Sequence, residues 1–268
     1  NKKVNGKKKN WECLHYNVSM YPYFDSLVSC SKEVMKVNRE KLAVKETYHK
    51  FGYAKNTVNE KRMEECRKHQ NTVWIHGREY LVKNQAKTRD YSRKIEIVRL
   101  PEQGYIYFLT MGRMSVEKNH TALIKAFARL RKENENIRLV IIGTGPLEKQ
   151  IKNLVDRENL CPYVTLTGNI NNPFVFMERS DCFILPSIHE GQPMVLLEAR
   201  VCDMPIIVSD FSTVNDSLYP NGQLLIGQDE ESIYEGLKAF TEGKVPKCDF
   251  NLQQYNQEAY EEFQMAIQ

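Results

Sequence analysis

The sequence predicts an α/β fold: a Rossmann-like parallel sheet with helices on both faces. Two features of the 268 residues predict it. From residue 104 onward, short apolar runs rich in β-branched and aromatic residues alternate with segments of helical periodicity. Glycine and polar residues follow most of these runs. Strands that alternate with helices pair in parallel through right-handed crossovers, which leaves a helical layer on each face of the sheet.

Six segments are predicted as strands because each is short, apolar and bounded by turn residues. Their continuous apolar character indicates burial on both faces, as in a parallel sheet. In chain order they are 105–111 (YIYFLTM), 137–143 (IRLVIIG), 163–167 (YVTLT), 181–186 (DCFILP), 205–209 (PIIVS) and 223–226 (QLLI).

Helices are predicted between these strands. Apolar residues from Leu123 to Leu130 follow the i, i+3, i+4, i+7 spacing of a buried helix face. A second helix is predicted within 145–159, with Pro146 near its first helical position. A third is predicted to start at Pro193 and to run through PMVLLEARVC.

The chain before residue 104 is polar and charged, and its predicted elements are short. We interpret 50–103 as a linker, and 104–242 as the sheet domain. The smaller predicted elements are a flexible lysine-rich tail (1–10), a strand (24–31), a helix (32–48) and two short linker strands (72–77 and 95–100).

Composition is typical of a folded globular protein, with 41% hydrophobic and 27% charged residues. No apolar run is long enough to span a membrane, and no signal peptide follows the lysine-rich N-terminus. The seven cysteines include no C-x-x-C pair, which indicates reduced thiols and a cytoplasmic location. Because the chain lacks a starting Met, we expect it to be a piece of a longer protein.

Charge is distributed unevenly along the chain. Residues 1–100 hold 23 Lys and Arg against 11 Asp and Glu, and the remainder holds 15 against 23. The basic part suits an anionic membrane surface or a phosphate-rich acceptor, and equally suits a solvated linker. Nucleic acid is a weaker interpretation because no nucleic-acid-binding motif accompanies the charge.

Four polar loops are predicted at one edge of the sheet, where ligands bind in open parallel sheets. They are GRMSVEKN (112–119), GTGP (143–146), GNINNP (168–173) and SIHEGQP (187–193). In the first, Arg113 and Lys118 beside a helix start form a candidate phosphate clamp, the alternative being two solvated surface charges. The glycines of GTGP permit either a tight turn or close approach to a ligand.

Two carboxylates flank the helix predicted to start at Pro193. Glu190 precedes it and Glu198 lies five residues, roughly 7.5 Å, along its axis. The first-turn amides, including those of Met194 and Val195, form an anion site. An anion held there has one carboxylate on either side, and carboxylates accept hydrogen bonds from hydroxyls. The pattern therefore fits a nucleotide-sugar, in which a diphosphate lies between a sugar and a ribose.

The segments GRMSVEKNHTALIKAF, LVIIGTGPLEKQI, VTLTGNINNP, DCFILPSIHEG, EGQPMVLLE and DMPIIVSD resemble, in this order, retaining glycosyltransferases of family four. EGQPMVLLE is similar to the E-x7-E signature of that GT-B family. The resemblance covers 104–240 well and extends more loosely to FDSLVSCS and FGYAKNTVN. EKNH and EGQPM are similar to enzymes of bacterial cell-wall and teichoic-acid-type polymer synthesis.

The resemblance implies a role for each matched residue. Arg113 and Lys118 neutralise the donor diphosphate and stabilise the leaving nucleotide, Glu190 binds a donor-sugar hydroxyl near the reaction centre, and Glu198 holds the ribose hydroxyls. The donor-binding set is completed by Gly112, the amides of Met194 and Val195, and backbone near Asn169 and Ile170 that faces the base.

The resemblance further implies a UDP-sugar donor, a glycan or lipid-linked polymer as acceptor, and a place in the cytoplasm at the inner membrane face. No metal or other cofactor is implied, because the two cations take the metal's part and the chain has no Asp-x-Asp motif. Two regions flank the donor domain: 1–49, a partial acceptor-side segment, and 243–268, whose helix at 251–268 either crosses back to the acceptor side or simply ends the chain.

The sequence departs from the family pattern in two respects. Gln192-Pro193 replaces the usual Phe-Gly-like pair, and Pro193 has no N–H, so one donor amide is lost. The acceptor side is short, so two hypotheses stay open: the donor half of an enzyme, or a nucleotide-sugar-binding module that serves a larger protein or a partner subunit. A dehydrogenase is disfavoured because G-x-G-x-x-G is missing. His189 is either a base or a loop residue.

Overall fold

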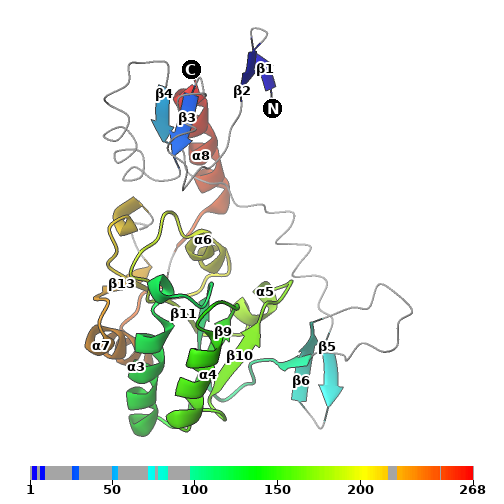
Figure 1. Ribbon diagram of the computed structural model, residues 1–268, viewed down its shortest axis with the longest axis vertical. Helices are drawn as coiled ribbons and strands as arrows, with labels where there is room; N and C mark the ends of the chain where they lie inside the picture. Colours follow the sequence, from blue (N-terminus) through cyan, green and yellow to red (C-terminus); the bar gives the residue numbers. More distant parts are fainter. Residues whose placement is uncertain are drawn as a thin grey trace.

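The computed structural model describes residues 2–4, 7–9, 26–29, 50–53, 72–75, 78–83, 97–216, 222–247 and 249–267. Figure 1 shows a parallel sheet with helices on both faces, which confirms the predicted fold class. The strand order is β10-β9-β8-β11-β12-β13, and every neighbouring pair is parallel. The strands are β8 (Ile106–Met111), β9 (Ile137–Ile142), β10 (Val164–Gly168), β11 (Cys182–Leu185), β12 (Ile206–Ser209) and β13 (Gln223–Ile226), each within one residue of its predicted ends.

The strands are apolar throughout because both faces of the sheet are covered. In β9, Leu139 and Ile141 pack into one hydrophobic cluster, while Val140 and Ile142 pack into the other. Successive side chains of a strand point to opposite faces, so a strand buried on both sides has no polar alternation.

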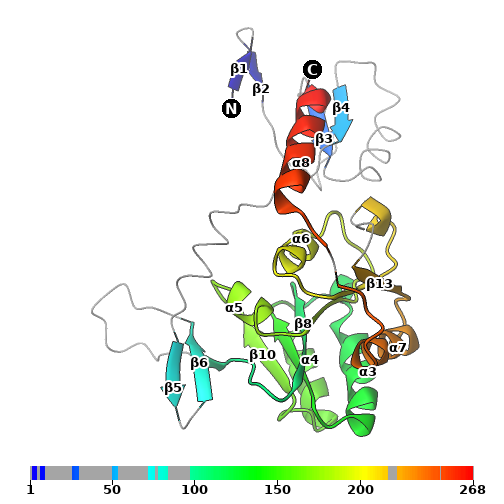
Figure 2. The ribbon, with the colours of Figure 1, turned by 180° about the vertical axis from the view of Figure 1, so that it is seen from behind.

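Among the described helices, three pack on one face of the sheet and two on the other, where Tyr255 of the terminal helix joins them (Figures 1 and 2). The first layer holds α3 (His120–Glu133), α4 (Glu148–Arg157) and α7 (Glu230–Thr241), and the second holds α5 (Phe174–Met177) and α6 (Met194–Val201). α5 and α7 were not predicted from the sequence. α7 has a start signal in Asp229, whose carboxylate accepts a hydrogen bond from the Ser232 amide at 2.9 Å.

Two helix starts differ from their predicted positions. Pro146 was expected near the first helical position and Pro193 at it, but α4 begins at Glu148 and α6 begins at Met194. Pro193 is the N-cap of α6, with φ −77° and ψ 95°. The φ that proline imposes suits both positions, and the extended ψ places this residue outside the helix.

The sheet has a switch point between β8 and β11. From β8 the chain adds β9 and then β10 on one side, and it adds β11, β12 and β13 on the other. The loops after β8 and β11 therefore diverge above two adjacent strands, at the place where open parallel sheets hold their ligands.

An antiparallel sheet of β5 (Thr72–Ile75), β6 (Arg78–Val82) and β7 (Ile97–Arg99) lies beside the main sheet (Figure 2). β5 and β7 fall within the two predicted linker strands, whereas β6 was not predicted. Leu81 and Leu100 are buried in the hydrophobic cluster of the α5–α6 face, and Arg179 pairs with Glu79 at 2.5 Å.

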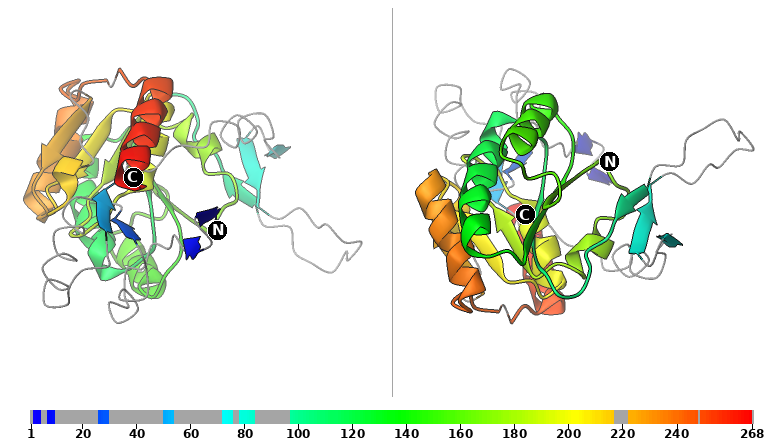
Figure 3. Two further views of the ribbon diagram at one scale, coloured as in Figure 1. Left: turned by 90° about the horizontal axis from the view of Figure 1, so that it is seen from above. Right: turned by 90° about the horizontal axis from the view of Figure 1, so that it is seen from below.

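The remaining described elements lie above the carboxyl edge of the sheet (Figures 1 and 3). α8 (Leu252–Ile267) confirms the predicted terminal helix and contacts β4 (Lys50–Tyr53), which pairs in parallel with β3 (Ser26–Ser29). The tail predicted to be flexible contains a hairpin of β1 (Lys2–Val4) and β2 (Lys7–Lys9). The helix predicted at 32–48 lies outside the described residues. No helix in the described ranges is long and apolar enough to cross a membrane.

Candidate functional site

Three loops at the carboxyl edge of the sheet are in direct backbone contact. The Gly143 amide, after β9, donates a hydrogen bond to the Gly168 carbonyl at 3.0 Å. Gly143 has φ +131°, and a Cβ there would overlap the Gly112 carbonyl oxygen. A Cβ on Gly145 would lie 2.5 Å from the Met114 oxygen. The glycines of GTGP therefore allow two loops to approach each other, which gives the tight-turn interpretation a structural reason.

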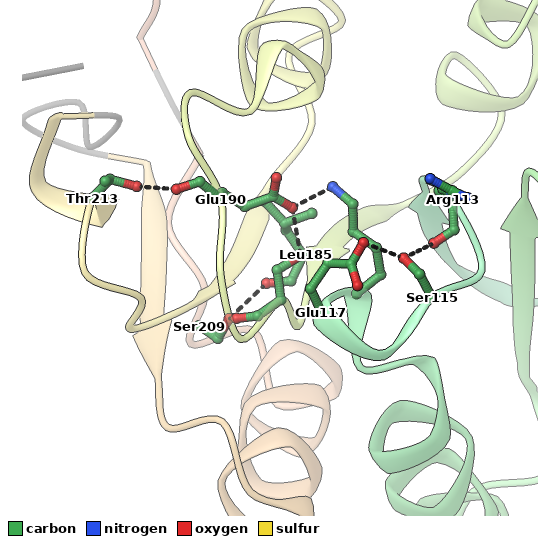
Figure 4. Close-up of polar contacts among 9 residues, drawn as sticks. Arg113, Ser115, Glu117, Leu185, Glu190, Ser209 and Thr213 are labelled. Carbon is green, nitrogen blue, oxygen red and sulfur yellow. Dashed lines mark hydrogen bonds and ion pairs between the residues drawn. The ribbon is translucent and has the colours of Figure 1, made fainter. Parts of the chain in front are cut away.

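The switch point brings two predicted site residues together. Lys118 ends the short 3-10 helix η2 (Val116–Lys118), and Glu190 lies in the loop after β11. Lys118 Nζ and Glu190 Oε1 are 2.5 Å apart, with the side chains 19% and 10% exposed (Figure 4). A Cβ on Gly112 would lie 3.4 Å from Lys118 Cδ, so the lysine stem passes over this residue at close range. The result is a cation and an anion held together at the carboxyl edge of the sheet.

Three buried hydroxyls support Glu190 and the loop that carries it (Figure 4). Ser187 Oγ donates to Glu190 Oε1 at 2.6 Å, and Thr213 Oγ1 donates to the Glu190 carbonyl oxygen at 2.6 Å. Ser209 Oγ donates to the Ser187 carbonyl oxygen at 2.5 Å. The sequence analysis did not identify these residues. In the sequence, only the Pro-Ser pair after β11 points to Ser187. The contacts of Ser209 and Thr213 join residues more than 20 positions apart, so no local pattern indicates them.

Further hydrogen bonds tie the loops after β8, β11 and β13 to one another. The Ile188 amide donates to the Glu117 carbonyl at 2.8 Å. Asn119 Nδ2 donates to the Gln228 carbonyl at 2.8 Å, and Gln228 Nε2 donates to the Ile188 carbonyl at 3.2 Å. Each loop thus has at least one hydrogen-bond partner in a loop that follows another strand. These contacts restrict the movement of the loops that carry Lys118 and Glu190.

The start of α6 lies between the two predicted glutamates in the chain. The Leu196 amide donates to the Pro193 carbonyl at 3.0 Å, and within the described ranges the amides of Met194 and Val195 donate to no backbone carbonyl. Glu198 is half-buried one turn further along α6. The first turn therefore offers amide donors and a positive helix end, as an anion site requires.

The other predicted residues lie on neighbouring loops. Arg113 is exposed, and its carbonyl accepts a hydrogen bond from Ser115 Oγ at 3.3 Å (Figure 4). Asn169 is exposed after β10, where its Oδ1 accepts from Thr144 Oγ1 at 3.2 Å, and Ile170 packs against the hydrophobic cluster of the α5–α6 face. His189, expected as a base or a packed loop residue, is exposed. Among the described residues, no three His, Cys, Asp or Glu side chains lie close enough together to hold a metal ion.

Two ionisable groups next to the site have lowered pKa values. The hydrogen bond from Ser115 lowers the pKa of the Glu117 carboxyl below its usual value. His120, the first residue of α3, is 2% exposed, and its Nδ1 has no hydrogen-bond partner among the described residues. Burial, together with the nearby Lys118 charge, lowers the pKa of His120 from 6.5 to about 4.

His120 should make stability depend on pH in a defined window. The folded protein keeps this ring neutral while the unfolded chain protonates it near pH 6.5, so its contribution is complete above that pH and is lost as pH falls toward about 4. We expect about 2 kcal/mol less unfolding free energy at pH 5 than at pH 7, measured by urea denaturation. His120→Gln should remove most of this difference, whereas His189→Gln, at an exposed position, should leave it in place. Equal pH dependence in the two variants would contradict the assignment.

The part of the chain that carries this geometry is similar to known glycosyltransferases. The family model described as "Glycosyl transferases group 1" matches residues 92–259. The N-acetylgalactosamine-N,N'-diacetylbacillosaminyl-diphospho-undecaprenol 4-alpha-N-acetylgalactosaminyltransferase of Campylobacter jejuni is 31% identical over 164 residues, which cover 60% of this chain and 44% of that protein. The UDP-Gal:alpha-D-GlcNAc-diphosphoundecaprenol alpha-1,3-galactosyltransferase of Escherichia coli is 33% identical over 159 residues, 57% of this chain and 40% of that protein.

Solved structures share the fold at low sequence identity. The pneumococcal O-GlcNAc transferase GtfA, in complex with UDP and GlcNAc, aligns with a TM-score of 0.63 and 14% identity over 94% of this chain and 45% of its own. TarM of S. aureus aligns with a TM-score of 0.58 and 15% identity over 92% of this chain and 42% of its own. The chain spans less than half the length of each of these four proteins.

Proposed function

The chain belongs to the glycosyl transferases group 1 family, and we propose that its sheet domain, residues 104–242, binds a nucleotide-diphosphate sugar, with UDP as the nucleotide. The proposed enzyme is a retaining glycosyltransferase of family four, and EGQPMVLLE is its E-x7-E segment. The whole protein would transfer the sugar to a glycan or lipid-linked acceptor of the cell envelope.

The observation that carries this proposal is the pairing of Lys118 with Glu190 at the switch point, next to the α6 N-terminus. A diphosphate at the first turn of α6 would meet the amides of Met194 and Val195 and the ammonium of Lys118. Glu190 would then lie on the sugar side of the phosphates and Glu198 on the ribose side, because carboxylates accept hydrogen bonds from hydroxyls and repel phosphate.

In this proposal Lys118 and Arg113 stabilise the departing nucleotide. Breaking the bond between the sugar and the diphosphate places negative charge on the phosphate oxygens. Fixed cations and helix amides stabilise that charge more strongly than they stabilise the bound donor, which lowers the barrier. Two cations in this position take the part that a metal ion plays elsewhere, so the proposed reaction needs no cofactor. Gly112 and the backbone near Asn169 and Ile170 would complete the donor site.

The acceptor side of the proposal has support from two sources. The E. coli and C. jejuni relatives are named for undecaprenol-linked acceptors, and the E. coli relative is also named for a UDP-Gal donor. The basic residues of 1–100 suit an anionic membrane surface at the inner face, or the phosphates of a lipid-linked or teichoic-acid-type polymer. In the whole protein, we propose that 1–49 and 243–268 belong to or contact an acceptor domain.

A second candidate is a nucleotide-sugar-binding module without turnover of its own. It rests on the same proposed donor site, because the family model matches residues 92–259, the part of the chain that holds that site. Both candidates predict donor binding. A turnover assay with a panel of acceptors separates the two candidates. It is run in parallel on this chain and on a longer chain of the same protein that matches the relatives' full length, and sugar transfer by the longer chain would exclude the binding module.

Binding of UDP tests the part that both candidates share. Glu198→Ala should lower UDP affinity in calorimetry more than tenfold, because hydrogen bonds to a charged group contribute about 1.5–3 kcal/mol. UDP lacking both ribose hydroxyls should bind the wild-type chain correspondingly weakly and should bind Glu198→Ala no worse than UDP does. If wild type discriminates between the two ligands and the variant discriminates equally, Glu198 does not hold the ribose; if wild type binds neither, the proposed function is wrong.

A further inference from the structure

We infer that Ser187 and Thr213 are positioning residues that present one oxygen of the Glu190 carboxylate to the donor sugar, an inference that rests on the proposed function. The two hydroxyls act on different parts of the glutamate. Ser187 holds the side chain through Oε1, and Thr213 holds the main chain through the carbonyl oxygen, each at 2.6 Å. A carboxylate held at both points keeps one position and one rotamer.

The carboxylate oxygens of Glu190 are not equivalent. Oε1 accepts from both Ser187 Oγ and Lys118 Nζ. Within the described part of the chain, Oε2 accepts no hydrogen bond, and Figure 4 shows it on the side of the carboxylate away from Ser209. An acceptor oxygen left open at the ligand-binding edge has the chemistry to bind a sugar hydroxyl.

The support behind these hydroxyls is rigid. Ser187 and Ser209 are fully buried and Thr213 is 3% exposed. Ser209, at the end of β12, donates to the carbonyls of Leu185 at 3.2 Å and Ser187 at 2.5 Å, so it fixes the chain at the end of β11. Thr213 lies just before the 3-10 helix η3 (Val214–Asp216), in which Val214 is 1% exposed. A buried hydroxyl donating to a neighbouring loop is a connection that an apolar side chain of equal size would lose.

In this proposal, the same contacts would keep Glu190 in place if Lys118 turned toward the donor phosphates. A diphosphate at the α6 start competes for the ammonium, and without Lys118 the carboxylate would be free to turn away. Ser187 and Thr213 do not depend on the phosphate, so they would hold Glu190 in place while its ionic partner changes. Groups that keep a binding geometry fixed matter because small displacements of a binding group have large effects on rate.

The test compares UDP-sugar with UDP alone, because only the first has a hydroxyl for Glu190 Oε2. The probes are UDP, UDP-glucose, UDP-galactose, UDP-N-acetylglucosamine and UDP-N-acetylgalactosamine, measured by calorimetry on the full chain. The quantity of interest is the ratio of UDP-sugar affinity to UDP affinity, which we call the sugar gain. Ser187→Ala and Thr213→Val should each lower the sugar gain about tenfold, the scale of one lost hydrogen bond, while UDP affinity stays within about twofold.

Two matched variants separate positioning from general stability. Thr213→Ser keeps the hydroxyl and should restore the sugar gain. Thr110→Val makes the same change as Thr213→Val at a strand residue that is 1% exposed and whose hydroxyl has no partner among the described residues, so it should change neither affinity. If Thr213→Val does not fold, Ser187→Ala carries the comparison.

Each outcome decides a different claim. A wild-type chain that binds none of the probes overturns the proposed function, and this inference with it. A wild-type chain that binds UDP but shows no sugar gain with any UDP-sugar leaves the phosphate site standing and overturns the role of Glu190 Oε2. A sugar gain that survives Ser187→Ala and Thr213→Val leaves the proposed function standing and overturns positioning. Loss in these variants, with recovery in Thr213→Ser, supports the inference.

Discussion

Lys118→Ala is expected to weaken UDP binding about 30-fold, because a hydrogen bond to a charged group contributes about 1.5–3 kcal/mol. It should also lower the unfolding free energy by about 2 kcal/mol, since Glu190 would remain as a carboxylate that is 10% exposed without its ionic partner. Calorimetry measures the first effect and urea denaturation the second. UDP affinity within twofold of wild type would contradict a phosphate role for this lysine.

Glu190→Gln provides the matched control. The amide keeps the size of the side chain and removes the negative charge that lies 2.5 Å from Lys118 Nζ. In the free protein this carboxylate competes with phosphate for the ammonium, so UDP should bind Glu190→Gln at least as tightly as it binds wild type. The double variant should bind UDP as weakly as Lys118→Ala but lose less stability than the two single variants together, because contacting residues are not additive. Additive stability losses would mean that the ion pair contributes nothing.

The strands were predictable because their local pattern is unusual. Five of the six have at least three consecutive apolar residues, and a short apolar run bounded by turn residues has few alternatives once helices alternate with it. α5 is a single turn of four buried residues, FVFM, in which helical spacing cannot be distinguished from a strand. Pro193 shows the limit at an element boundary, because the φ of proline fits both the N-cap and the first helical position.

Within the site, the residue types could be predicted from the sequence, but most of their hydrogen-bond and ion-pair partners could not. Lys118 and Glu190 could be assigned to one sheet edge because each follows a strand. That they form an ion pair depends on which strands are neighbours, and β8 and β11 are adjacent although they are 70 residues apart in sequence. The hydroxyls of Ser209, at the end of β12, and of Thr213, in the loop after it, donate to the main-chain carbonyls of Ser187 and Glu190. A serine or threonine in such a loop carries no local signal of a tertiary hydrogen bond.

Gly143→Ala should cause the largest loss of stability, about 4 kcal/mol in urea denaturation, a value reached only through a few mechanisms such as steric overlap combined with backbone strain. The added Cβ would overlap the Gly112 carbonyl oxygen, and the residue has φ +131°. The atoms that the Cβ would meet are the backbone oxygen and carbon of Gly112. The overlap can therefore be relieved only if the loop that carries Gly112 and Lys118 moves. We therefore also expect the folded variant to bind UDP more weakly than wild type.

Gly104→Ala separates the two causes of that loss. Gly104 has φ +91°, and a Cβ there would meet no atom within 4 Å, so the substitution introduces backbone strain without overlap. Strain of this kind costs about 1–3 kcal/mol, and UDP affinity should not change because residue 104 precedes β8 at the opposite edge of the sheet. The excess loss in Gly143→Ala then measures the close approach of the two loops. If both variants lose equal stability and bind UDP equally, loop contact at Gly143 does not set the position of Lys118, and the lysine must be held by Glu190 and the packing of its own stem.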